Sequence, residues 1–137
     1  MAKNYITAAM LLDELNTGLK FEDVPVPELG DADTVVRIRE LSGNERVEYN
    51  DYVQSFKTEN VEDVAVKDII NIMSKIVQIT MVDPVTGKRV LSDSQVNVLN
   101  SKSPDVITRL ATKALELSGM KPEQLEEAKN SLKNDQS

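Results

Sequence analysis

Residues 61–82, VEDVAVKDIINIMSKIVQITMV, carry the richest run of aliphatic side chains in the chain and decide its fold. If the whole stretch is helical, it is 22 residues long, or about 33 Å. The apolar face of such a helix is wider than the stripe of an ordinary surface helix. The helix is therefore predicted to lie at the centre of the core or to offer part of its face to a partner. Its polar residues recur at helical spacing and form one narrow stripe: Lys67, Asp68, Asn71, Ser74, Lys75 and Gln78.

The end of this stretch has two interpretations. Residues 77–81 alternate between apolar and polar side chains and are β-branched at several positions, which favours a strand. The polar stripe, however, keeps its helical phase as far as Gln78, so we expect the helix to continue to about Thr80. Pro84 then stops it, and Gly87 provides the positive φ of the turn that follows.

The N-terminal part is predicted to contain a short helix and a hairpin. Residues 5–15 are amphipathic and end before Gly18, and we expect their apolar side to pack on the core, the alternative being that it docks a partner. In residues 19–41, two extended segments flank a Gly-containing turn, which predicts a β-hairpin. Pro25 and Pro27 restrict the first of them to the edge of a sheet.

Helix-start signals mark most of the remainder of the chain. Ser42 and Glu45 form a capping box, and Ser92 with Gln95 forms a second one. Another helix is predicted to begin at Pro104 and to end before Gly119. Behind the first box, four residues share one helical face that we expect to contact the core: Tyr49, Tyr52, Val53 and Phe56.

The expected fold is therefore mainly α: a compact multi-helix domain with a small N-terminal β-hairpin. One domain is predicted over residues 1–132, with the hairpin at about 19–41 and helices over about 42–132, the last of them from Pro122. Residues 133–137 are expected to fray.

Composition excludes several function classes. Lys and Arg number 16 against 23 Asp and Glu, a net charge of −7, which disfavours nucleic acid and anionic membrane surfaces as partners. The chain has neither His nor Cys, so the usual general base, the thiolate nucleophile and the commonest metal ligands are missing. No spacing of the remaining polar residues picks out a catalytic pair. We expect no enzyme activity, no cofactor and no metal.

Five short motifs occur in an order that resembles one protein family. They are residues 24–30 (VPVPELG), 36–46 (VRIRELSGNER), 82–88 (VDPVTGK), 92–103 (SDSQVNVLNSKS) and 117–120 (LSGM). Together they resemble the tail assembly chaperones of long-tailed bacteriophages over about residues 20–132. One departure is Leu29, where that family often has Trp.

The resemblance implies a non-catalytic assembly factor. Such proteins bind the long, helical tape-measure protein and keep it soluble in the host cytoplasm while the tail tube polymerises around it. They are absent from the mature virion. The resemblance also implies weak self-association, and a longer form, made by ribosomal frameshifting, that contacts the tail-tube protein.

A partner-binding face is predicted on the 61–82 helix, which has more apolar positions than a surface helix needs. Its candidate residues are Ile69, Ile72, Met73, Ile76 and Ile79. Two other functions remain open. One is a small structural tail or connector subunit of the virion, and the other is an acidic regulator that binds a host protein through residues 28–33.

Overall fold

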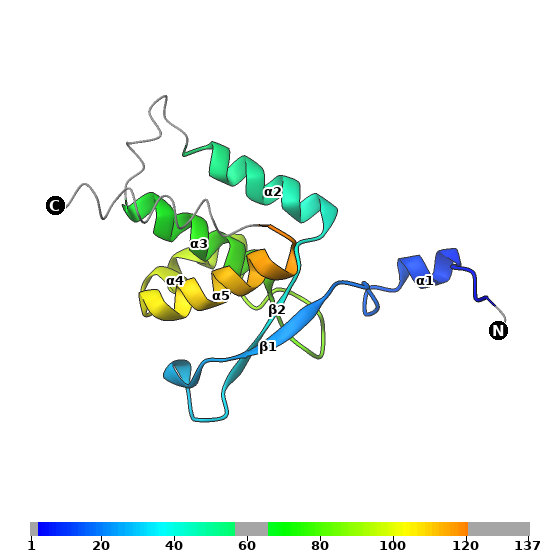
Figure 1. Cartoon of the computed structure of the whole chain (residues 1–137), viewed down its shortest axis with the longest axis horizontal. Coiled ribbons are helices and arrows are strands. Elements are labelled where there is room, and N and C mark those ends of the chain that lie inside the picture. Colours follow the sequence, from blue (N-terminus) through cyan, green and yellow to red (C-terminus); the bar gives the residue numbers. More distant parts are fainter. Residues whose placement is uncertain (1–2, 57–65, 121–137) are drawn as a thin grey trace.

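The computed structural model describes residues 3–56 and 66–120. In these residues, five α-helices, three strands and two short 3-10 helices follow one another (Figure 1). Their bounds are α1 Ala8–Leu12, β1 Phe21–Pro25, η1 Pro27–Leu29, β2 Val35–Arg39, α2 Gly43–Gln54, α3 Val66–Thr80, β3 Met81–Val82, η3 Asp93–Gln95, α4 Val96–Asn100 and α5 Pro104–Leu117. The predicted last helix, the frayed tail and the start of the 61–82 helix lie outside the described residues.

The three strands form one antiparallel sheet in the order β1-β2-β3. Phe21 of β1 lies opposite Arg39 of β2, which confirms the predicted hairpin and the edge position of its first strand. On the other side of β2, Arg37 lies opposite Val82. The predicted fold is confirmed in part: the helices and the hairpin are present, but the sheet has a third strand, so helices and strands are mixed rather than the fold being clearly mainly α. A strand of two residues is too short to show a period in the sequence.

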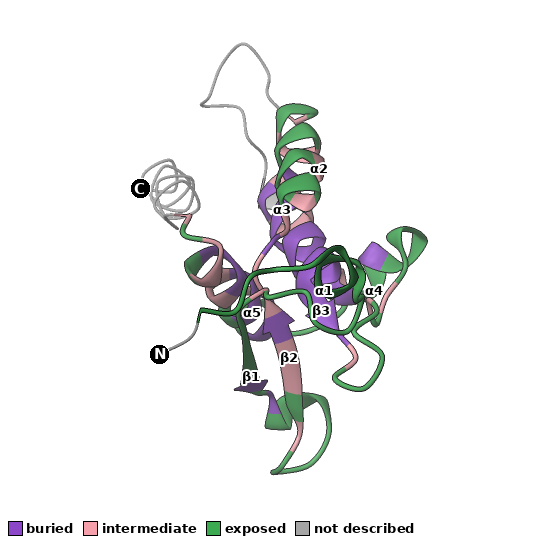
Figure 2. Ribbon diagram, turned by 90° about the vertical axis from the view of Figure 1, so that its right-hand side faces the viewer, coloured by how far each residue is buried: buried purple, intermediate pink, exposed green. Residues whose placement is uncertain are grey.

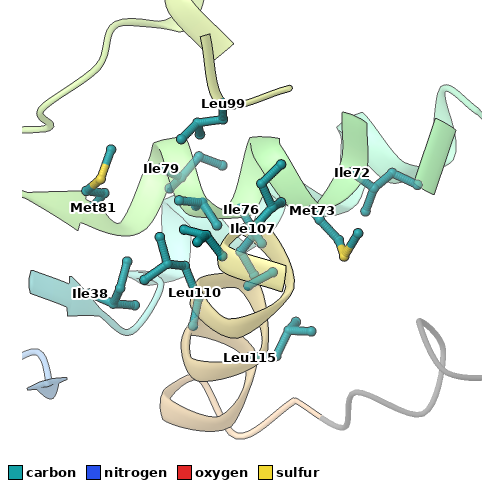
Figure 3. Packing of buried hydrophobic residues seen from close by; sticks show 14 of the residues in the cluster. Ile38, Ile72, Met73, Ile76, Ile79, Met81, Leu99, Ile107, Leu110 and Leu115 are labelled. Atoms are coloured by element: carbon teal, nitrogen blue, oxygen red, sulfur yellow. The ribbon is translucent and has the colours of Figure 1, made fainter. Parts of the chain in front are cut away.

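Helix α3 lies at the centre of the molecule. It ends at Thr80, as the phase of the polar stripe predicted, and the chain continues directly into β3. Figure 3 shows Ile76 and Met73 of α3 beside Ile107 and Leu110 of α5, with Ile38 of β2 to the left of Leu110. From Ile72 to Thr80 every residue of α3 is buried. The core is thus built around one helix, and the other elements cover its sides.

The later part of the polar stripe of α3 bonds to neighbouring elements, whereas Lys67 near its start is exposed. The Ser74 hydroxyl donates to Asn100 Oδ1 at 2.6 Å, and Asn100 Nδ2 donates to Asn71 Oδ1 at 2.9 Å, which joins α3 to α4. Gln78 Nε2 donates to the carbonyl of Leu91 at 3.0 Å. Buried polar groups are tolerated when they are paired in this way.

The predicted caps and turns are present. Ser42 Oγ accepts from the Glu45 N–H at 3.3 Å, and the Glu45 carboxylate accepts from the Ser42 N–H at 3.0 Å. Ser92 and Gln95 form the same reciprocal pair before η3. Pro104 begins α5, and Gly119 follows its end with a φ of +68°. These local signals fix where α2 and α5 begin and where α5 ends.

Candidate functional site

The N-terminal arm, defined as residues 5–15, extends away from the body of the molecule (Figure 1). Every residue from Lys3 to Gly18 is exposed, so the expectation that this segment packs on the core was wrong. Its helix, α1, is one turn long and is capped by Thr7, whose hydroxyl accepts from the Met10 N–H at 3.3 Å. The Asp13 carboxylate accepts from the Leu15 N–H, which turns the chain out of the helix.

The arm concentrates exposed apolar side chains. Exposure reaches 81 % for Tyr5, 74 % for Leu11 and 79 % for Leu12. Within the described residues, it holds six of the thirteen large hydrophobic side chains that are exposed: Tyr5, Ile6, Met10, Leu11, Leu12 and Leu15. Single exposed hydrophobic residues are normal on soluble proteins, but a cluster of this kind marks an interaction surface. The arm is therefore the candidate site.

The residues predicted for partner contact on α3 lie in the core instead. None of the five is more than 8 % exposed: Ile69, Ile72, Met73, Ile76 and Ile79. In the described conformation no partner reaches them without displacing a covering helix. Binding through these residues stays a prediction.

Three helices cover α3, each on a different side. Met73 faces α5, where the Thr108 hydroxyl lies 3.8 Å from its sulfur. Asn71 and Ser74 face α4 through Asn100. Lys75 faces α2, where its ammonium lies 3.5 Å from Glu48 Oε2 and 5.6 Å from the centre of the Tyr52 ring.

A network of charges holds α2 to the rest of the molecule. Glu45 Oε2 accepts from Arg39 Nη2 at 2.7 Å and from Arg89 Nη2 at 2.9 Å. Arg89 also pairs with Glu48, at 3.1 Å. Burial raises the pKa of Glu45, but the hydrogen bonds from Arg39, the Ser42 N–H and Arg89 outweigh it and lower the pKa to about 2. Arg89 lies 44 positions beyond Glu45 along the chain, so no local pattern could have shown this network.

An open hollow of about 430 Å³ lies beside the network. Its lining is Gln78, Arg89, Val90, Leu91, Ser92, Asp93 and Gln95. The cation in this lining, Arg89, is already paired with acids, and Asp93 accepts from Lys75 and Gln78. The arrangement offers ordinary structural ion pairs rather than a nucleophile with its base.

Comparisons with known proteins identify the family of the chain. The model of the phage tail assembly chaperone family matches residues 7–131. The chain belongs to this family. The match includes α1 and continues through the whole described core. As a tail assembly chaperone, the protein has partners in the phage tail, and the family's role is a non-catalytic one.

The tail assembly chaperone of bacteriophage HK97 has a similar structure. The TM-score is 0.57 at 22 % sequence identity, with 79 % of this chain and 92 % of the HK97 chain covered. At this identity the likeness shows a shared fold. No curated protein sequence matches the chain. Among the described residues, none of the helices combines the length and apolarity that crossing a membrane requires.

Proposed function

We propose that this chaperone binds the tape-measure protein, keeps it soluble in the host cytoplasm and helps to recruit tail-tube subunits before it leaves the growing tail. Membership of the tail assembly chaperone family supports the general role. The observation that carries the specific proposal is the exposed N-terminal arm, which presents apolar side chains to solvent away from the core.

The chemistry of the arm suits an amphipathic helical partner. Apolar stripes on a long helical protein aggregate unless another apolar surface covers them, and helices bind in this way through anchors one turn apart. Within α1, Leu11 and Leu12 follow Ala8 by three and four positions and so share its side of the helix, and the methionine Met10 adapts its shape to different neighbours. The net charge of −7 supports solubility of the chaperone while the arm is exposed.

The test is co-expression of the intact chain with its tape-measure protein. Replacing Leu11→Asp and Leu12→Asp together should lower the amount of soluble, co-purifying tape-measure protein by about tenfold or more, the size of effect expected when anchors of an interface are lost. Both side chains are exposed, so the unfolding free energy should change by less than about 0.5 kcal/mol.

The matched control is Val85→Asp. Val85 is 82 % exposed and lies in the turn after β3, outside the arm. It should leave recovery of the tape-measure protein at the wild-type level. Equal recovery with the arm variant and with wild type would refute the assignment of the arm. If the wild-type chain itself binds no tape-measure protein, the specific function is refuted.

Tail-tube recruitment, self-association and absence from the virion are each tested by a separate measurement. Recruitment of the tail-tube protein would use a longer, frameshifted form, which the coding DNA beyond Ser137 reveals. Weak self-association is measured by sedimentation of the purified chain. A chaperone is absent from finished particles, so detection of this chain in purified virions by mass spectrometry would favour the structural tail or connector subunit instead.

A further inference from the structure

Helix α2 covers one face of α3 with few apolar contacts. Of its twelve residues, Tyr49 alone is buried, and the rest of its core-facing side is only partly covered. Tyr52, Val53 and Phe56 are half-buried at the edge of the core. In Figure 2 the outward side of α2 is exposed along its length, while α3 below it is buried.

Charged groups supply the remaining contacts of α2. The face of α3 beneath it carries Asp68, Ile72 and Lys75, which are spaced by four and three residues and therefore share one side of the helix. Lys75 is 8 % exposed, and its ammonium lies 3.3 Å from Asp93 Oδ1 and 3.5 Å from Glu48 Oε2 of α2. Burial, and then the charge of Asp68, raise the pKa of Tyr52 above its ordinary value, in agreement with this arrangement.

Elements that are held by few buried apolar contacts open at lower free energy than the core of a protein. Loss of α2 would uncover Ile72 and Lys75 and would leave the contacts of α3 with α4 and α5 in place. The uncovered face would fit a helix, because in the described conformation it is occupied by helix α2. Asp93 would stay beside Lys75, and the places that Glu48 and Tyr52 vacate suit a second acidic group and an aromatic ring.

We propose that α2 is a removable cover, and that an amphipathic helix of the tape-measure protein with an acidic and an aromatic residue one turn apart replaces it on the Asp68–Ile72–Lys75 face. This inference rests on the proposed function. It also explains how the partner would reach Ile72, one of the predicted contact residues that is buried while α2 is in place. The arm would then make the first contact and α3 the second.

Hydrogen exchange of the free, intact chain tests the cover. Amides of α2 should exchange at least about tenfold faster than those of α5, because α2 opens without global unfolding. Glu48→Gln, which removes the pairs to Lys75 and Arg89 but keeps the capping box, should widen this difference. Glu28→Gln is the control, because it breaks an ion pair of 2.7 Å with Arg109 elsewhere on the surface. Equal exchange of α2 and α5 in the wild type and in Glu48→Gln would overturn the proposal.

Exchange in the complex with the tape-measure protein tests the replacement. Amides of α2 should lose protection on binding while those of α3 keep it. Gain of protection in α2, or protection of the arm with α2 unchanged, would show that the partner binds on top of α2 or elsewhere, and the proposal would be wrong.

A peptide distinguishes failure of this inference from failure of the proposed function. The probe is a labelled peptide of residues 42–56, added to the Glu48→Gln chain, whose own cover is weakened. It should bind, and the same peptide with Glu48→Lys should bind at least about tenfold more weakly because Lys75 repels it. If no complex with the tape-measure protein forms, the proposed function fails and this peptide decides the inference. Equal binding of the two peptides, or no binding of either, overturns it.

Discussion

Helices α2 and α5 both pack on α3, but different forces hold them. Six residues of α5 are buried: Val106, Ile107, Leu110, Ala111, Ala114 and Leu115. α2 has one buried residue and is attached by the pairs of Glu45 and Glu48 with cations of three other segments. Two helices of similar length on the same neighbour thus make one fully buried apolar interface and one that combines partly buried apolar residues with ion pairs.

The comparison shows which interface is permanent. Complete burial of an aliphatic side chain contributes about 1.5–3 kcal/mol, and these contributions add along α5. The net contribution of an ion pair is small, because desolvation offsets the attraction, although removing one partner of a buried pair is costly. We therefore expect α5 to define the stability of the core, and α2 to be sensitive to charge.

The largest effect is expected for truncation of α5. Leu110 is 1 % exposed and lies against α3, so Leu110→Ala should lower the unfolding free energy by about 3–4 kcal/mol through lost burial and the cavity left behind. Urea denaturation followed by circular dichroism measures it. A decrease in the unfolding free energy of less than about 1 kcal/mol would mean that α5 is no better packed than α2. The proposed difference between the two helices would then be wrong.

A smaller effect is expected from titration of Glu45. Because its pKa is lowered from the ordinary value of 4.5 to about 2 in the folded state, its contribution is complete above pH 4.5 and disappears as the pH falls towards 2. The lost stability should be about 2 kcal/mol, less than the full shift implies, since the pair is partly screened by solvent.

Measurement of the unfolding free energy between pH 6 and pH 2.5 checks this dependence. Glu45→Gln should remove most of the slope that Glu45 produces. Glu28 also has its pKa lowered to about 2, by the hydrogen bond from Arg109, but it lies on the surface. Glu28→Gln should therefore change the slope less, and equal effects of the two variants would contradict the special role of the α2 network.

The smallest effect is expected for apolar truncation on α2. Val53 is half-buried at the edge of the core, so Val53→Ala should cost about 1 kcal/mol or less. The same urea series as for Leu110→Ala gives the comparison directly. A cost close to that of Leu110→Ala would show that apolar packing, rather than charge, holds α2 in place.

Several elements were predictable because their signals lie within one or two turns. A capping box needs two residues three positions apart, as at Ser42 and Glu45, and the end of α3 at Thr80 followed from the phase of its own polar stripe. The candidate site was not predictable in the same way. The apolar side of residues 5–15 was visible in the sequence, but an amphipathic helix looks the same whether it packs on the core or faces solvent.

The sequence by itself determined the helices, their caps, the hairpin and the turn at Gly87, because backbone conformation depends on neighbouring residues. The tertiary structure alone decided which apolar faces are covered. It paired Met81 with Ile38, enclosed the five predicted contact residues of α3 and left the N-terminal arm exposed. It also brought Arg89 to Glu45. Such contacts join segments far apart in the chain, and burial is a property of the packed assembly that local spacing does not encode.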